Sequence, residues 1–285
     1  MEMKIYPSKI IVFTIIMVFM GICITSCSRN VAKSSNQNIL EIPENSYSNR
    51  QDLKNFAIPE GTTKIGEGAF RNCSNLISVT IPNSVTYISD WAFNRCSKLS
   101  TIVIPEGVDS IGMGTFMGCS RLVSVELPKN LKCIGDMSFH GCSRLTNISI
   151  PESVESIGAY AFQHCESIKE IAIPQNVTSI GENAFNNCIA LTSFIVPDSI
   201  KTLNWGTFMG NTGLLTISIP PSVIKIENDV FHGCTNLRSL TIPNSVSSIG
   251  DDAFCECYQL VLTIPKCYKG NEKIGLGYCK QVIFY

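Results

Sequence analysis

Residues 150–162 read Ile-Pro-Glu-Ser-Val-Glu-Ser-Ile-Gly-Ala-Tyr-Ala-Phe, and this stretch recurs along the chain every 23 residues. Prolines stand at positions 59, 82, 105, 128, 151, 174, 197, 220 and 243, and phenylalanines keep the same spacing at positions 70, 93, 116, 139, 162, 185, 208, 231 and 254. Nine repeats of one length without an insertion predict a solenoid, in which each repeat buries its apolar face only against its neighbours.

Two periodicities meet within each repeat. Val79 and Ile81 alternate with Ser78 and Thr80, which predicts a short strand with one buried face; Pro82 ends it because proline has no N–H to donate. In six repeats a glycine follows the second aliphatic pair, where we expect a turn with positive φ: Gly66, Gly112, Gly135, Gly158, Gly181 and Gly250. Residues 92–99 then place Ala, Phe, Cys and Leu at the spacing of one helix face. Each repeat is therefore predicted to hold a short parallel strand, a turn and one or two helical turns.

The pattern I-P-x-S-V-x-x-I-G-x-x-A-F-x-x-C-x-x-L-x-x-V/I resembles the BspA-like subfamily of leucine-rich repeats over residues 53–265. The resemblance implies a right-handed, curved α/β solenoid used for adhesion or other protein contacts outside the cell. Repeat seven departs from the pattern, with Asn204 for glycine, Asn211 for cysteine, and an added Trp205. Residues 266–285 lose the pattern and are read as a C-terminal cap, with Val282, Phe284 and Tyr285 available to cover the last apolar layer.

The N-terminus has the features of a targeting segment. Lys4 and Lys9 precede an apolar run at residues 10–24, which is short for a membrane-spanning helix of roughly 20 residues. The run leads into Ile24-Thr25-Ser26-Cys27, which resembles a bacterial lipobox and implies a signal peptide at residues 1–26 and lipid attachment at Cys27. The alternative is an ordinary secretory signal that happens to hold a cysteine.

Residues 27–52 are expected to form a flexible tether followed by an N-terminal cap, since residues 28–38 have almost no apolar content. In the cap, Ile42–Pro43 resembles the Ile-Pro end of a repeat strand, although it lies 16 residues before Pro59 and so off the period. The net charge of −1 argues against a nucleic-acid partner or an acidic substrate.

Cysteine is the strongest candidate for chemistry, with 14 in the chain. Eight of them occupy one repeat position and would form a ladder: Cys73, Cys96, Cys119, Cys142, Cys165, Cys188, Cys234 and Cys257. The ladder could hold disulfides or a metal, or it could fill tight turns with small, buried, reduced side chains. Asn211 in the same position favours the second interpretation. One disulfide could pin the C-terminal cap, and its partners stay open among Cys255, Cys257, Cys267 and Cys279.

The histidines and the rest of the sequence do not indicate an enzyme. Zinc needs four converging ligands, whereas His140, His164 and His232 should point outward to solvent while the ladder cysteines point inward. The sequence shows no nucleophile elbow, phosphate loop or paired catalytic carboxylates. We therefore expect no catalysis, no metal and no cofactor.

Two surfaces are candidates for binding a partner. Outward strand positions form columns that repeat proteins commonly use for binding, unless Ser and Thr are there simply as good exposed strand residues; the candidates are Ser78, Thr80, Thr101, Glu126, Ser149, Glu170, Ser193, Ser218 and Thr241. Glu126 and Glu170 would suit a basic partner segment around repeats three to five. Trp91 and Tyr160 share a position before the expected helical turn, where they either form an exposed interface or half-bury against the repeat.

These features predict a lipid-anchored, extracytoplasmic leucine-rich-repeat scaffold that binds a protein, by adhesion to a host or by contact within the envelope. The alternative is a structural or assembly protein of the bacterial envelope facing the periplasm, and a third possibility is an accessory subunit that binds polysaccharide. We expect an outer-membrane lipoprotein. Its membrane face stays open, because Ser28-Arg29-Asn30 lacks the acidic run associated with surface export.

Overall fold

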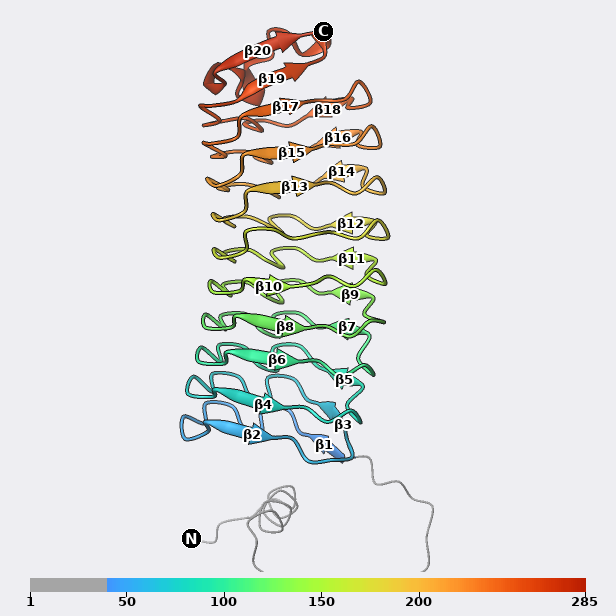
Figure 1. Cartoon of the computed structure of the whole chain (residues 1–285), viewed down its shortest axis with the longest axis vertical. Helices are drawn as coiled ribbons and strands as arrows, with labels where there is room; N and C mark the ends of the chain where they lie inside the picture. The colour runs from blue at the N-terminus through green and yellow to red at the C-terminus, as the bar shows by residue number, and fades with distance from the viewer. Residues whose placement is uncertain (1–39) are drawn as a thin grey trace, which may run out of the picture. The chain divides into compact units, whose positions relative to one another are not determined.

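The computed structural model describes residues 40–285, in which the repeats stack as a parallel-strand solenoid of about eleven turns (Figure 1). Most strands pair with the equivalent strand one repeat further on, as Ile102 does with Val125. A shift of one whole repeat per turn brings equivalent repeat positions side by side. The predicted signal peptide, Cys27 and most of the predicted tether lie outside the described residues.

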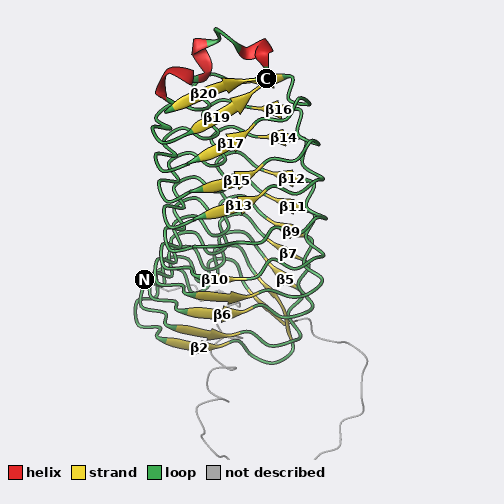
Figure 2. Cartoon of the chain, turned by 45° about the horizontal axis from the view of Figure 1, so that its top comes forward, coloured by secondary structure: helices red, strands yellow, loops and turns green. Residues whose placement is uncertain are grey.

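Most repeats contribute two short strands, which form two columns along the solenoid (Figures 1 and 2); residues 169–173 form no strand of the first column. The first column holds β2 (Asn55–Ala57), β4 (Ser78–Thr80), β6 (Thr101–Val103), β8 (Ser124–Glu126), β10 (Asn147–Ile148), β13 (Ser193–Ile195), β15 (Thr216–Ser218), β17 (Ser239–Thr241), β19 (Val261–Ile264) and β20 (Gln281–Phe284). The second column holds β1 (Leu40–Ile42), β3 (Thr62–Ile65), β5 (Tyr87–Ile88), β7 (Ser110–Ile111), β9 (Cys133–Ile134), β11 (Ser156–Ile157), β12 (Ser179–Ile180), β14 (Thr202–Leu203), β16 (Lys225–Ile226) and β18 (Ser248–Ile249).

The core is organised around a stack of the nine repeat phenylalanines, all of which are fully buried. Neighbouring ring centroids lie between 5.3 and 6.1 Å apart, and their planes deviate by 13° or less. The widest gap, 6.1 Å, separates Phe185 from Phe208, where Phe194 replaces an aliphatic strand residue and packs against both rings. The ring stack accounts for the regular phenylalanine spacing in the sequence.

The segment after each phenylalanine is not helical, so the predicted helical turns are wrong in this detail. It runs as successive turns, in which Cys96 N donates to Phe93 O at 3.1 Å and Leu99 N donates to Cys96 O at 3.0 Å. Two positions per repeat have positive φ, such as Trp91 at 59° and Arg95 at 57°, and a right-handed helix cannot continue through them. The helices of the described chain are three short 3₁₀ segments at the C-terminal end: Lys266–Tyr268, Glu272–Ile274 and Leu276–Tyr278.

The repeat glycines serve close packing, and the prediction that they have positive φ is wrong. A Cβ atom on Gly158 would lie 2.5 Å from Asp136 N and 2.7 Å from the carbonyl carbon of Gly135, so the preceding turn leaves no room for a side chain. Positive φ falls two residues later, at Tyr160 with 57°. Glycine is thus selected here for size.

The N-terminal end is a partial repeat in register with the others. Ile42 pairs with Ile65, so Pro43 corresponds to Gly66, and the predicted match with the Ile-Pro end of a strand is wrong. Tyr47 extends the aromatic stack, with its ring centroid 5.1 Å from that of Phe70 and the planes 3° apart. The 23-residue period therefore begins before Pro59, the first of the regularly spaced prolines.

At the C-terminal end, β20 continues the first column by pairing Val282 with Leu262. Val282 and Phe284 are half-buried and Tyr285 is exposed, whereas Ile274, which the sequence did not single out, is fully buried. The Tyr285 hydroxyl donates to Ile242 O at 2.7 Å and so ties the last residue back across the stack.

Candidate functional site

The first strand column presents the predicted binding face. All nine candidate side chains on this face are exposed. Between them, the alternate strand residues Ile102, Val125 and Leu240 are at most 4% exposed. Val103 and Ile195, which are 56% and 69% exposed, lie on the same outward column as Glu126. The face therefore combines hydroxyls, isolated aliphatic groups and carboxylates on a buried support.

Glu170 is exposed but does not lie on a strand, which corrects its predicted placement. The first column divides into three sheets, β2–β4, β6–β8–β10 and β13–β15–β17–β19–β20, and no strand of this column forms between β10 and β13. Within the described chain, the amides of residues 169–173 donate no hydrogen bond, although Lys169 O accepts one from Thr192 N at 3.1 Å. Glu126 therefore lies on a strand of the ladder, whereas Glu170 lies in the gap.

The aromatic side chains of the rival surface are half-buried, as the packing interpretation predicts. The Trp91 ring lies over Gly114, where an added Cβ would collide with ring carbons. Partial burial and the Glu182 carboxylate raise the pKa of Tyr160. Trp91 therefore contributes to packing between repeats.

The ladder cysteines are buried hydrogen-bond donors. Each thiol donates to the carbonyl oxygen of the aromatic residue 26 positions earlier, for example Cys165 Sγ to Phe139 O at 3.2 Å. Burial raises the pKa of Cys188 and of Cys234 to about 12. The interpretation of small, buried side chains is confirmed for the ladder. All twelve cysteines between residues 40 and 285 are free thiols, including the four at the C-terminal end.

Asn211 replaces the thiol in repeat seven and is fully buried. Neither its Oδ1 nor its Nδ2 has a hydrogen-bond partner among the described residues. Each cysteine of the ladder thus makes a side-chain hydrogen bond, whereas the Asn211 side chain in the same repeat position makes none within the described chain.

The histidines are half-buried, which contradicts the prediction that they are solvated. The rings of His140 and His164 lie 5.7 Å apart, and burial together with His164 lowers the pKa of His140. His232 Nδ1 lies 3.1 Å from Asp229 Oδ1. Over residues 40–285, no group of three or more His, Cys, Asp and Glu side chains is arranged to hold a metal ion.

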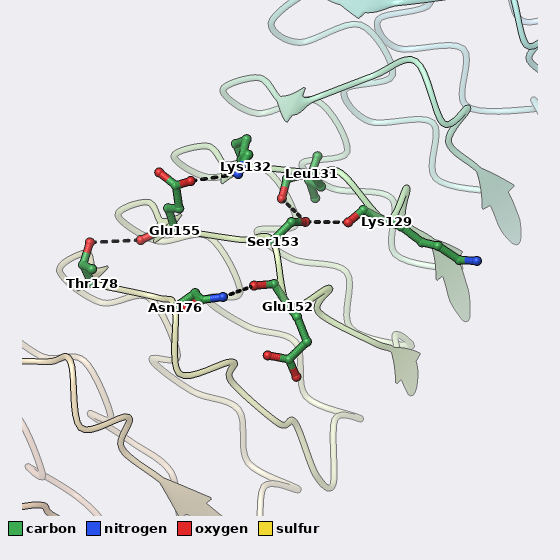
Figure 3. Close-up of polar contacts among 8 residues, drawn as sticks. All are labelled: Lys129, Leu131, Lys132, Glu152, Ser153, Glu155, Asn176 and Thr178. Carbon is green, nitrogen blue, oxygen red and sulfur yellow. Dashed lines mark hydrogen bonds and ion pairs between the residues drawn. The ribbon is translucent and has the colours of Figure 1, made fainter.

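Polar side chains also join the repeats along the edge that precedes the second column (Figure 3). Ser153 Oγ lies 2.7 Å from both Lys129 O and Leu131 O in the preceding repeat. Lys132 Nζ and Glu155 Oε1 form an exposed ion pair at 2.9 Å, a type of pair that contributes little to stability. The serine of the repeat motif is therefore structural.

Sequence reasoning noted Trp205 but did not place it in a site. The structure places it beside a surface groove after β14, with Lys225, Glu227 and Asn228. Its indole Nε1 donates to Asp229 Oδ2 at 3.0 Å. The only sequence feature that could have indicated this groove was the departure of repeat seven from the repeat pattern.

Comparison with known proteins agrees with the geometry. The model of the BspA type leucine-rich repeat region matches residues 40–148 and 132–261. The chain belongs to this family. No helix of the described BspA-type chain is long and apolar enough to cross a membrane. None of the curated proteins compared with it matches.

Three crystal structures resemble the BspA-type chain. A leucine-rich cell surface protein from Faecalibacterium prausnitzii is 29% identical, with a TM-score of 0.53 over 86% of this chain and 78% of that one. A leucine-rich repeat protein from T. pallidum is 34% identical, with a TM-score of 0.52 over 54% of this chain and 72% of that one. The pneumococcal vaccine antigen PcpA shares the fold, at 20% identity and a TM-score of 0.54 over 74% of this chain and 62% of that one.

Proposed function

We propose that this chain is a lipid-anchored, extracytoplasmic scaffold without catalysis, which binds a protein partner on its first strand column. The observation that carries the proposal is the row of exposed side chains along the first column, most of them on short strands whose alternate residues are buried. A surface fixed in this way loses little conformational entropy on binding. The bacterial cell-surface relative supports an extracytoplasmic location.

The partner segment is basic with aliphatic side chains. Glu126 and Glu170 supply negative charge, while Val103 and Ile195 offer apolar contact. Charges at the rim of an interface mainly raise the association rate. Host adhesion and contact with an envelope protein both fit this chemistry.

Charge reversal tests the binding face. A partner captured from host matrix proteins or from envelope extract should associate more slowly with the Glu126→Lys, Glu170→Lys variant, and added salt should reduce the difference. The matched control is Glu152→Lys with Glu182→Lys, two exposed carboxylates away from the strand face. Equal slowing in both variants would refute a specific role for the strand face.

Anchoring is tested separately. We expect Cys27→Ser to abolish incorporation of labelled palmitate and to leave an unprocessed or mislocalised precursor. Palmitate labelling that survives the substitution would remove the lipoprotein proposal. Protease treatment of whole cells then distinguishes the adhesion function from the alternative, an assembly role facing the periplasm.

A further inference from the structure

A groove of about 360 Å³ lies beside the second strand column in repeats seven to nine. Its lining includes Trp205, Lys225 from β16, Glu227 and Asn228 from the turn after β16, and Ser248 and Gly250 from the next repeat. The volume falls at the lower end of the ~300–1,000 Å³ range of small-molecule sites. It is separate from the first-column face proposed to bind protein.

The indole of Trp205 is both exposed and fixed. The side chain is 40% exposed. Its Nε1 donates to Asp229 Oδ2 at 3.0 Å, and its backbone N donates to Glu227 Oε2 at 3.1 Å. His232 Nδ1 in turn lies 3.1 Å from Asp229 Oδ1. An aromatic ring held this way forms a preorganised platform for stacking.

The carboxylates around the ring already have partners. Glu227 Oε1 lies 2.8 Å from Lys225 Nζ, and Asp229 bonds Trp205 and His232. A cationic ligand would compete with these contacts, so the local charge does not favour a cation. The groove can still offer both donors and acceptors: the Ser248 hydroxyl, the remaining Lys225 protons and the Asn228 amide, whose Oδ1 accepts from Asp251 N at 3.1 Å.

One departure from the repeat pattern, Glu227, lines this groove. Glycine occupies the close-packed position of six repeats, and Ser89, Asn204 and Glu227 take it in repeats two, seven and eight. The Glu227 carboxylate accepts hydrogen bonds from Lys225 Nζ and from the backbone N–H of Trp205. The replacement of the repeat glycine by Glu227 thus helps to form the groove beside Trp205.

We propose that this groove binds a neutral pyranose unit of a glycan. A pyranose has a C–H face that stacks on an indole and a rim of hydroxyls that each donate and accept hydrogen bonds. Trp205 supplies the stacking surface, and Asn228, Ser248 and Lys225 meet the hydroxyls. This binding activity goes beyond the proposed protein contact and does not depend on it.

Fluorescence titration tests the proposal in the full chain. The sequence holds two tryptophans, so Trp91→Phe leaves Trp205 as the only one. Titration of this variant with a set of neutral oligosaccharides of differing linkage should change the Trp205 emission saturably for at least one of them. On a neutral-glycan array, Trp205→Ala should bind that sugar about tenfold or more weakly, and Trp205→Phe should retain part of the affinity. The matched control, Trp91→Phe, should bind as the unaltered chain does.

Ser248→Ala provides a second variant, with an expected severalfold loss of affinity from one hydroxyl contact. Circular dichroism confirms that each variant is folded. The proposal is overturned by no saturable response to any neutral sugar, by equal binding of Trp205→Ala, or by a response to an oligoarginine peptide alone. None of these results would bear on binding at the first strand column.

Discussion

Asn211 occupies a position built for a thiol. In the regular repeats the thiol donates a hydrogen bond to the carbonyl oxygen of the phenylalanine in the preceding repeat, as Cys188 Sγ does to Phe162 O at 3.2 Å. The Asn211 amide sits fully buried in the equivalent position with both polar atoms unpaired. A buried polar group without a partner costs about 1–3 kcal/mol.

Asn211→Cys should therefore raise the free energy of unfolding by about 1–3 kcal/mol. Urea unfolding followed by circular dichroism measures this as a higher midpoint at an unchanged m value. The reverse exchange, Cys188→Asn, should lower the midpoint. If Asn211→Cys lowers it instead, the amide makes a contact that the thiol cannot replace.

Burial also lowers the chemical reactivity of the ladder thiols. Because burial raises the pKa of the Cys188 thiol to about 12, very little of it is ionised at pH 8, and the thiolate is the reactive form. Cys267, which is exposed, should react with maleimide first, and the ladder thiols should react only after unfolding. Peptide mapping of native and urea-treated protein measures this; rapid native labelling of Cys188 would contradict it.

Among the elements, the phenylalanine stack depends on neighbours on both sides. Phe162 lies 5.4 Å from both Phe139 and Phe185, whereas Phe254 meets one repeat ring, Phe231, at 5.9 Å. Phe162→Ala should cost about 3–5 kcal/mol and Phe254→Ala less, in denaturant titrations of both variants. Equal losses would argue against stability built from nearest-neighbour contacts.

The two classes of glycine should respond differently to substitution. Gly158→Ala inserts a methyl group against the backbone of the preceding turn and should cost about 1–3 kcal/mol. Gly141 has a φ of 72° with no atom closer than 3.8 Å to an added Cβ, so Gly141→Asn should cost less than about 1 kcal/mol. A larger melting-point decrease for Gly141→Asn would reverse the assignment.

The sequence predicted the period, the first-column strands and the buried phenylalanine and cysteine positions, because repeated packing leaves a repeated pattern. The prediction from sequence failed where the same residue spacing fits two different local geometries. Residues at the separation of Ala92, Phe93 and Cys96 fit a helix and a run of turns equally, and glycine can be selected for φ or for size. The groove at Trp205 required coordinates, since its walls come from three repeats.

At the scale of the whole molecule, the strand face has the fewest backbone hydrogen bonds where the first column is interrupted. The amides of residues 169–173 donate no hydrogen bond within the described chain, whereas Thr192 and Val196 in the next repeat both donate one. Hydrogen exchange measured by mass spectrometry should therefore be faster at residues 169–173 than at 192–196. Equal protection of the two peptides would show that the ladder is continuous in solution.

The pairing of most strand residues with their counterparts 23 positions away also bears on how such a chain changes over generations. An unequal crossover in the coding DNA that adds or removes one whole period leaves every remaining side chain with the same kind of neighbour. Both end segments still meet a regular repeat. We therefore expect the solenoid to keep its fold when its length changes by whole periods, and the length of its strand face to change with it.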